Sequence, residues 1–132
     1  MKVHDSHVLS YEVNHKERKI IFRLIYDYPD TPKEYTDVIF HEIEGYQFYN
    51  GALGNIIFGF YEIPVQKLID EKRNYLTEAY HQSGAPGPWA SDLSTAAAHL
   101  TNSGAKAFEF GSSIGIEGWI VANRMEVRDG KA

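Results

Sequence analysis

The chain has 132 residues, of which 43% are hydrophobic and 23% are charged, and it contains no cysteine. This length fits one domain, residues 1–132, that folds around its own core without a disulfide framework or a metal. The lack of cysteine excludes thiol catalysis, a CxxC redox pair and cysteine-ligated metals. The formal net charge of -5 argues against a nucleic-acid partner, because such binding needs a basic face that neutralises phosphates.

The lack of long apolar stretches bears on the cellular location of the protein. No apolar stretch approaches the roughly 18 to 20 residues of a membrane-spanning helix, and residues 1–10 lack the apolar core of a signal peptide. We therefore expect a cytoplasmic protein with no membrane partner. No phosphate-binding loop or dinucleotide fingerprint occurs, because no glycine opens a helix after a strand. The sequence accordingly predicts no cofactor, and it assigns no catalytic residue and no metal ligand to its leading hypothesis.

Strands are predicted for most of the first half of the chain, where apolar and polar residues alternate with the two-residue period of a half-buried strand. The stretches with this period are residues 3–14, 18–28, 35–43 and 56–61. The third stretch is expected to continue past Gly45 to residue 49. Residues 14–17 form a hairpin turn, and Pro29 and Pro32 end the second stretch because proline cannot donate to a strand ladder.

After Pro64 the period changes to that of a helix. Apolar side chains recur every three or four positions over residues 65–80, which predicts one amphipathic helix with its apolar stripe against the sheet. Pro64 suits the first turn of this helix, and Gly84 lies just beyond its end. A second helix, capped by Ser91, is predicted over residues 93–100, and it is the weaker of the two because its apolar stripe is mostly alanine.

Two strands are predicted to close the chain, over residues 106–112 and 118–128. Strands, then helices, then strands again are typical of an α+β fold with a largely antiparallel sheet. We therefore expect about five to six strands, with the longer helix and the weaker helix packed on one face of the sheet.

A small group of polar residues has the composition of a site. Asp5 and His7 share a strand face that is otherwise apolar, where a hydrogen bond between carboxylate and imidazole would satisfy both groups. His41 would supply a third side chain. Asp5, His7 and His41 therefore support the alternative hypothesis of a small-molecule-binding or metal-binding enzyme, which requires the three to meet in space.

Charge is distributed unevenly along the chain. Residues 24–63 contain seven acidic residues and one lysine, a net charge of -6, while the rest of the chain sums to +1. The same segment holds ten of the eighteen aromatic residues. An acidic surface with exposed tyrosines suits a basic protein partner, because complementary charge accelerates and selects binding. A solubilising face on an acidic protein is the plainer interpretation of the same pattern.

The residues expected on this surface lie outside the predicted core. Tyr28 and Tyr35 flank the proline-containing loop, where a tyrosine is more easily exposed than in the middle of a strand. The predicted partner-binding residues are Asp27, Tyr28, Asp30, Glu34, Tyr35, Asp37, Glu42 and Glu44. A homo-oligomer is compatible with the same sequence.

The opening of the chain resembles a known family. Residues 4–10 read HDSHVLS, followed by IIFRL at residues 20–24 and YTDVIF at residues 35–40. This order resembles small bacterial domains grouped with the immunity proteins of polymorphic toxin systems, over about the first 50 residues. The resemblance implies a non-enzymatic protein that binds and blocks a cognate toxin, in many cases a cationic nuclease. It transfers no functional residue, because immunity interfaces differ from one toxin pair to the next.

The leading hypothesis is therefore a single α+β domain that binds a protein partner, a basic toxin by the resemblance, through an acidic, tyrosine-bearing surface. The competing hypothesis is an enzyme or ligand binder built on Asp5, His7 and His41. A structure separates the two by showing whether the acidic side chains gather on one face or the three polar residues converge.

Overall fold

One antiparallel sheet of eight strands organises the chain, and the computed structural model describes residues 1–131 of it. The strands are β1 (Ser6–Asn14), β2 (Lys19–Tyr26), β3 (Glu34–His41), β4 (Gly45–Tyr49), β5 (Ile56–Ile63), β6 (Lys106–Ile114), β7 (Glu117–Ala122) and β8 (Arg124–Asp129). The helices are α1 (Val65–Glu71), α2 (Arg73–Ser83), the short 3-10 helix η1 (Pro88–Ser91) and α3 (Leu93–Asn102). The α+β class predicted from the sequence is confirmed.

The prediction of about five to six strands is wrong, and two sharp bends are the reason. The stretch expected to run from residue 35 to 49 divides into β3 and β4, and the stretch 118–128 divides at Asn123 into β7 and β8. At the first bend Glu42 has a left-handed backbone conformation, with φ of 56°. Each bend coincides with two consecutive polar residues, His41 and Glu42 at the first and Asn123 and Arg124 at the second, but the alternation resumes beyond them, so each stretch still resembles one continuous strand.

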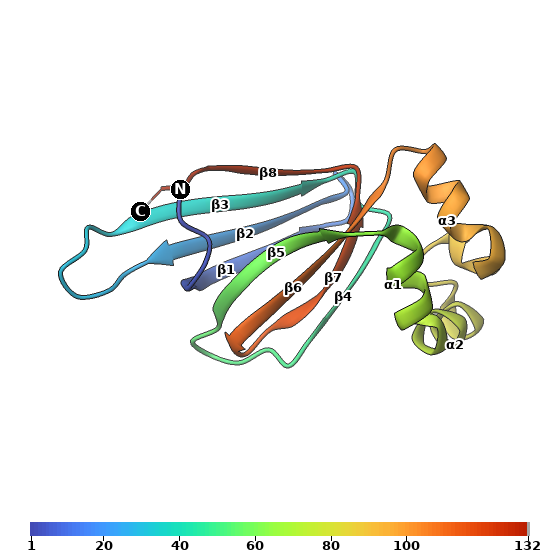
Figure 1. Cartoon of the computed structure of the whole chain (residues 1–132), viewed down its shortest axis with the longest axis horizontal. Helices are drawn as coiled ribbons and strands as arrows, with labels where there is room; N and C mark the ends of the chain where they lie inside the picture. The colour runs from blue at the N-terminus through green and yellow to red at the C-terminus, as the bar shows by residue number, and fades with distance from the viewer. Residues whose placement is uncertain (132) are drawn as a thin grey trace.

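The bends fold the sheet onto itself. The strand order is β4-β7-β6-β5-β1-β2-β3-β8, and β1 pairs with β5 only through Ser6 and His7. One half, β8-β3-β2-β1, therefore crosses over the other half, β5-β6-β7-β4, as a second layer (Figure 1). The backbone N–H of Asn123 donates to the carbonyl of His41 at 2.9 Å, which joins the two bends at one end of the molecule.

The main core fills the space between these halves. Phe22, Phe40, Phe110 and Ile120 point inward from four different strands, and none has more than 3% of its surface exposed. The ring of Phe22 lies 5.3 Å from that of Phe110 and 6.3 Å from that of Phe40, centre to centre, in edge-to-face arrangements that aromatic rings favour. Burial of each such side chain stabilises the fold by about 1.5–3 kcal/mol.

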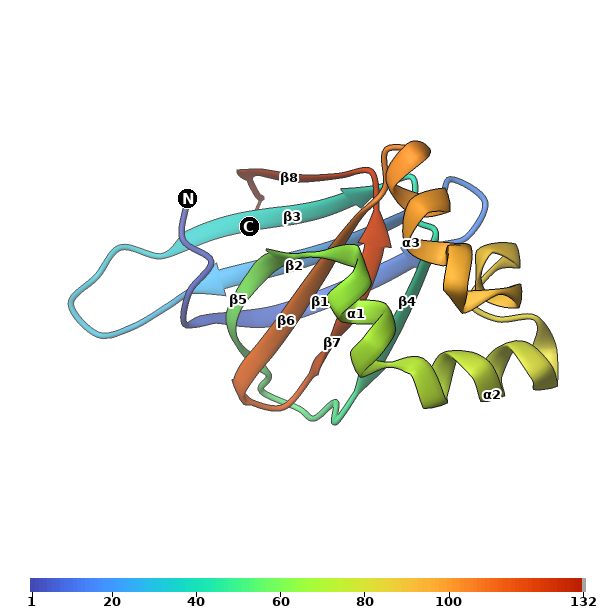
Figure 2. The ribbon, with the colours of Figure 1, turned by 45° about the vertical axis from the view of Figure 1, so that its right-hand side comes forward.

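The helices gather at one end, where they cover part of the outer face of β6 and β7 (Figure 2). Leu68, Leu76 and Leu100 pack there with Trp119 of β7 in a second core. The helix expected over residues 65–80 is divided into α1 and α2.

The division occurs at Lys72, whose φ of -105° and ψ of 14° interrupt the helix. Residues 1–131 thus contain three α-helices where two were expected. Asp92, and not Ser91, caps α3 by accepting a hydrogen bond from the N–H of Ser94 at 3.0 Å.

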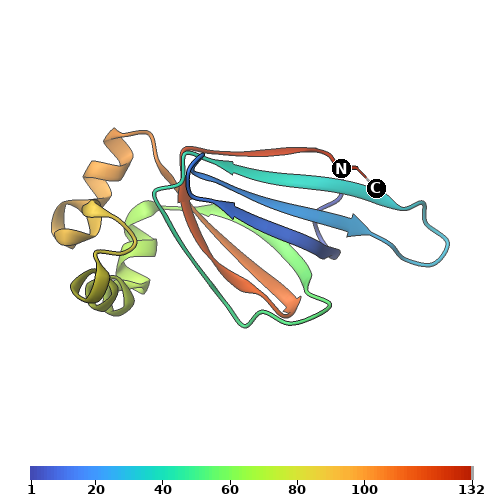
Figure 3. The same cartoon turned by 180° about the vertical axis from the view of Figure 1, so that it is seen from behind.

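The outer face of the half formed by β1, β2, β3 and β8 carries no helix (Figure 3). Arg23, Asp37 and Arg128 lie side by side across β2, β3 and β8 on this face, so it is strongly charged. In the described part of the chain, every helix is too short or too polar to cross a membrane.

Candidate binding cleft

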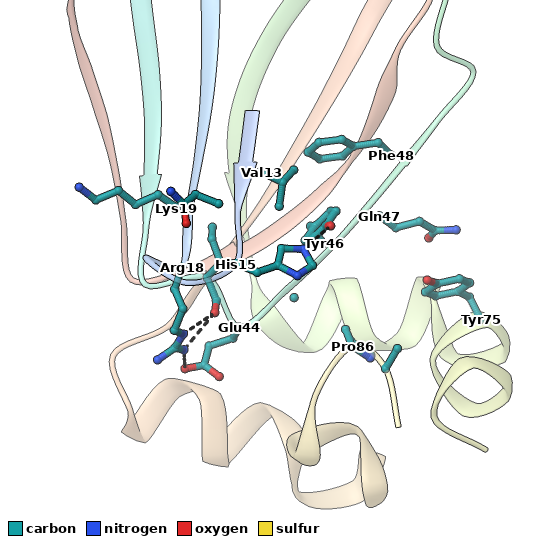
Figure 4. Close-up of a pocket in the computed structure, with 14 residues that line it drawn as sticks. Val13, His15, Arg18, Lys19, Glu44, Tyr46, Gln47, Phe48, Tyr75 and Pro86 are labelled. Carbon is teal, nitrogen blue, oxygen red and sulfur yellow. Dashed lines mark hydrogen bonds and ion pairs between the residues drawn. The ribbon is translucent and has the colours of Figure 1, made fainter. Parts of the chain in front are cut away.

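A cleft of about 570 Å³ lies at the end of the molecule that carries the helices. The β1–β2 turn, strand β4, helix α2 and the loop around Pro86 surround it (Figure 4). Its position follows from the bends, because β4 turns away from β3 and leaves a gap beside the β1–β2 turn that no strand fills.

Aromatic side chains form the walls of the cleft. Tyr46 and Phe48 of β4, Tyr75 of α2 and His15 of the β1–β2 turn all line it. The Nε2 atom of His15 lies 3.0 Å from the hydroxyl of Tyr46, so a hydrogen bond joins the β1–β2 turn to β4. The ring of Phe48 meets that of Phe110 edge to face at 5.3 Å. The cleft floor is therefore continuous with the main core.

An ion pair closes one end of the cleft. Arg18 has a left-handed backbone conformation, with φ of 54°, in the β1–β2 turn. Its guanidinium donates from Nε and Nη2 to the carbonyl of Ile43, at 3.1 and 3.0 Å, and from Nη2 to the carboxylate of Glu44 at 2.6 Å. Figure 4 shows these bonds joining the turn to the β3–β4 bend.

Gln47 and Tyr75 border the cleft on the side of α2 (Figure 4). The indole N–H of Trp119 donates to Oε1 of Gln47 at 2.9 Å, which fixes the orientation of the amide. The amide nitrogen of Gln47 is then the end of the side chain that can donate to a ligand.

Strand β4 borders the cleft with an open edge. Within residues 1–131, β4 pairs with β7 on one side and with no strand on the other. Backbone N–H and C=O groups of alternate residues on such an edge are left without ladder partners and readily accept another strand. Residues 43–48 all line the cleft, so the open edge and the hollow coincide.

The eight predicted partner-binding residues do not gather into one patch. Asp27 and Asp30 lie in the β2–β3 loop, at the end of the molecule far from the helices (Figure 1), whereas Glu42 and Glu44 lie at the helical end. Strand β3 separates the two groups by about 25 Å, since an eight-residue strand rises about 3.3 Å per residue. Among the eight, Glu44 alone lines the cleft.

Most of these carboxylates also have a positively charged partner. The pairs are Asp27 with Lys33 at 3.9 Å, Glu34 with the N-terminal amine at 2.9 Å, Asp37 with Arg128 at 3.9 Å, and Glu44 with Arg18 at 2.6 Å. Glu42 accepts a hydrogen bond from the side-chain amide of Asn123. The structure therefore does not assemble the continuous acidic surface that the charge segregation predicts.

The two tyrosines of that surface are half-buried. The hydroxyl of Tyr28 donates to the backbone carbonyl of Asp5, and burial, followed by the nearby charge of Asp5, raises the pKa of Tyr28. Tyr35 lies on the outer face of β3, opposite Ile25 of β2. Both tyrosines were predicted to be exposed, and neither side chain is fully exposed in the structure.

Asp5, His7 and His41 do not converge either. Asp5 has a left-handed backbone conformation before β1 begins, and its carboxylate lies 3.4 Å from Nε2 of His4. The predicted hydrogen bond between Asp5 and His7 is therefore wrong, because strand alternation does not apply at Asp5. His7 instead has its ring 5.6 Å from that of Tyr28.

His41 is the last residue of β3, whereas His7 lies near the level of Tyr35 at the start of that strand. Its Nε2 atom is 2.8 Å from the Glu126 carboxylate, and this hydrogen bond is the main cause that lowers the pKa of Glu126. In residues 1–131, no three side chains of histidine, cysteine, aspartate or glutamate lie close enough to hold a metal ion.

Apart from Glu44, none of the residues that line the cleft was predicted from the sequence as a binding residue. His15, Gln47 and Tyr75 come from a turn, an edge strand and a helix, so no local motif joins them. The available signal was the aromatic run after Gly45, which would have been notable had the bend before it been recognised. Comparison of the chain with protein-family models, with curated proteins and with solved structures finds no match.

Proposed function

We propose that the chain is a non-enzymatic protein-binding module that takes an extended segment of a partner protein along the open edge of β4, inside the cleft. The observation that carries this proposal is the coincidence of the unpaired edge with a hollow of about 570 Å³. When a peptide adds to a sheet edge, backbone hydrogen bonds supply affinity and the neighbouring pockets select side chains.

The cleft walls suit the side chains of such a segment. Alternate residues of an added strand point to opposite sides, so one set faces Tyr46 and Phe48 on the core side of β4. The other set faces Tyr75 and Gln47, on the side of α2. The proposal therefore favours a partner segment with large apolar or aromatic residues at alternate positions.

The chemistry of the lining supports binding over catalysis. Among the described residues that line the cleft there is no serine, threonine or cysteine to act as a nucleophile. Three charged residues line the cleft: Arg18 and Glu44 are paired with each other at 2.6 Å, and Lys19 lies 3.9 Å from Glu17. A site that orients and desolvates a ligand needs no more than these aromatic walls and a few fixed polar groups.

The resemblance to immunity proteins specifies the partner further. In this proposal the partner is a toxin whose extended segment or β-strand enters the cleft, and binding takes place in the cytoplasm. Because most carboxylates near β3 are paired, the proposal places the contact at β4 and assigns the acidic residues a solubilising role, with Glu44 at the rim.

A small aromatic molecule is a second candidate occupant. The cleft volume lies within the range of roughly 300 to 1,000 Å³ that is usual for small-molecule sites, and its walls include the aromatic side chains of Tyr46, Phe48 and Tyr75. Competition between such a molecule and a bound peptide would show that both use the same walls.

The proposal is tested with peptides selected on the folded protein from a random displayed library. We expect Tyr75→Ala to weaken binding of the selected peptides about tenfold or more, since central aromatic contacts contribute most to binding. The matched control is Tyr61→Ala, which removes an exposed tyrosine outside the cleft. Fluorescence anisotropy with labelled peptides measures both.

A second experiment tests whether the peptides bind in the cleft or to the acidic residues. Glu34→Lys combined with Asp37→Lys should leave peptide affinity within about twofold, because neither residue lines the cleft. A loss of affinity in this variant, with Tyr75→Ala unaffected, would transfer the function to the acidic residues. Failure to select any peptide would also contradict the proposal.

A further inference from the structure

Strand β8 is the second open edge of the sheet. Within residues 1–131 it pairs with β3 and with no other strand. The N–H of Gly130 donates to the carbonyl of Tyr35 at 2.9 Å, in register with the β3–β8 ladder. Because backbone groups alternate in direction along a strand, Met125, Val127 and Asp129 direct their N–H and C=O groups away from β3.

The side chains of β8 alternate in charge on the outer face of the sheet. Arg124, Glu126 and Arg128 follow one another there, while Met125 and Val127 face the core side. An edge strand carrying charge of one sign repels a copy of itself and so resists pairing. This edge carries charges of both signs at neighbouring outer positions, so it can match a second copy of itself.

We propose that two copies of this chain pair through antiparallel β8 strands, with Val127 opposite Val127 of the second copy. In this register Met125 lies opposite Asp129 of the second copy, so every outward N–H and C=O group from residue 125 to residue 129 finds a partner. Glu126 lies opposite Arg128 of the second copy, and the symmetry makes this contact twice. Opposite charges directly across two strands stabilise the pair.

Neighbouring registers are less favourable. A register centred on Glu126 places Glu126 opposite Glu126 of the second copy and Arg124 opposite Arg128, so like charges meet. A register centred on Met125 would need the N–H of Asn123, which already donates to the carbonyl of His41. The charge order and the bend at Asn123 therefore select the register centred on Val127.

An apolar hollow beside β8 supports pairing with a second β8 strand. Met125 and Val127 line a hollow of about 230 Å³ together with Val3 and residues 58–61. Phe58 in that hollow has 51% of its surface exposed. A second β8 strand extends the sheet along this side, and its own Met125 and Val127 then lie toward the same apolar hollow.

The test is the molar mass in solution, measured by light scattering after size exclusion across a hundredfold range of protein concentration. The wild-type chain should approach twice the 15.0 kDa chain mass as its concentration rises. Glu126→Arg and Arg128→Glu should each weaken the dimer about tenfold or more, because each places like charges opposite one another at two positions. Combining both substitutions in one chain should restore the dimer.

Mixing the Glu126→Arg and Arg128→Glu variants is the most specific test of the proposed contact. In the mixed pair each substituted side chain faces an opposite charge, so a heterodimer should form from two variants that are monomeric alone. Arg128→Glu also tests the register, since in a dimer centred on Glu126 this change would place opposite charges at positions 124 and 128 and strengthen the pairing, whereas it weakens a dimer centred on Val127. Circular dichroism and thermal unfolding check that each variant is folded.

Val127→Pro tests the backbone contact without changing charge. The N–H of Val127 points away from β3, so proline there removes a donor from the proposed dimer and none from the β3–β8 ladder. We expect a folded monomer, while the control Val127→Ala stays dimeric. A wild-type chain that is monomeric throughout, or a dimer that persists in Val127→Pro, would overturn the inference. Peptide binding at β4 is measured separately and is independent of this result.

Discussion

Arg18 and Glu44 are 26 positions apart in the chain, and their side chains meet at 2.6 Å at one end of the cleft. The same guanidinium holds the carbonyl of Ile43 through two further hydrogen bonds. The β1–β2 turn is thereby fixed against the bend between β3 and β4. These contacts continue the β2–β3 ladder beyond the pair Lys19 and His41, since the N–H of Ile43 also donates to the carbonyl of Arg18 at 3.0 Å.

Two substitutions of Arg18 separate the stabilisation that its side-chain hydrogen bonds provide from the strain of its left-handed backbone conformation. Arg18→Ala should lower the free energy of unfolding by about 1–2 kcal/mol, because charge-assisted hydrogen bonds are lost and the left-handed conformation remains strained. Arg18→Gly should be milder by about 1 kcal/mol, since glycine adopts that conformation freely. Urea unfolding measures both, and a glycine variant as unstable as the alanine variant would contradict this account.

Gly118 of β7 allows β4 to approach closely. A Cβ atom at position 118 would collide with the backbone carbonyl of Gln47 and lie 3.2 Å from the Phe110 ring. Gly118→Ala should therefore displace β4, destabilise the protein by about 2 kcal/mol or more, and weaken peptide binding.

Gly111 of β6 is the matched control for that substitution. Nothing lies within 4 Å of a Cβ atom built at position 111, so Gly111→Ala should leave stability and binding nearly unchanged. Thermal unfolding and anisotropy measured on both variants check the pair. Equal effects would show that the close approach of Gln47 does not position β4.

Phe22 is the centre of the aromatic core. It is fully buried and its ring contacts those of Phe40, Phe60 and Phe110. Phe22→Ala should lower the free energy of unfolding by about 3–5 kcal/mol, since the cavity adds to the lost transfer energy. Phe58→Ala, with half of its ring already exposed, should cost less than about 1 kcal/mol. Similar losses in denaturant unfolding would contradict the assignment of the core.

Glu109 gives the stability a pH dependence. Burial, followed by hydrogen bonding to Glu71 and its charge, raises the pKa of Glu109 above its ordinary value of 4.5. A carboxyl group with a raised pKa contributes stability that is fully present below the unfolded pKa and is lost as the pH rises through the folded pKa.

Glu109→Gln should therefore raise the melting temperature relative to the wild type at pH 7, and the gain should disappear near pH 4. Melting curves recorded at several pH values check this difference. Glu78→Gln on an exposed face of α2 serves as the control with one charge fewer. A gain that persists at pH 4, or one that the control reproduces, would show that the Glu71–Glu109 contact is not its source.

The sequence predicted most elements of the fold because each buries one face of a regular period. The alternation around Phe22 marks β2, and the change of period after Pro64 marks the start of the helices. The bends at Glu42 and Asn123 were missed, because strand alternation resumes on the far side of each and the glycine beside the first bend, Gly45, is also compatible with a bulge in one continuous strand.

The missed bends also explain why the site was not found. The acidic residues were expected to share a face on the basis of sequence proximity, but β3 carries Glu34 and Glu42 to opposite ends of one layer. The cleft depends on which strand lies at the sheet edge, and strand order is a property of the whole chain. Tyr75 joins the site only through the packing of α2 on β7, which no local pattern encodes.

The most direct test of the proposed function is amide hydrogen exchange of the wild-type protein with and without a selected peptide. An added strand forms new backbone hydrogen bonds along β4, so alternate amides of Gly45–Tyr49 should exchange more slowly in the complex. Amides of the β2–β3 loop, around Asp27 and Asp30, should be unchanged. Protection of that loop without protection of β4 would contradict the account.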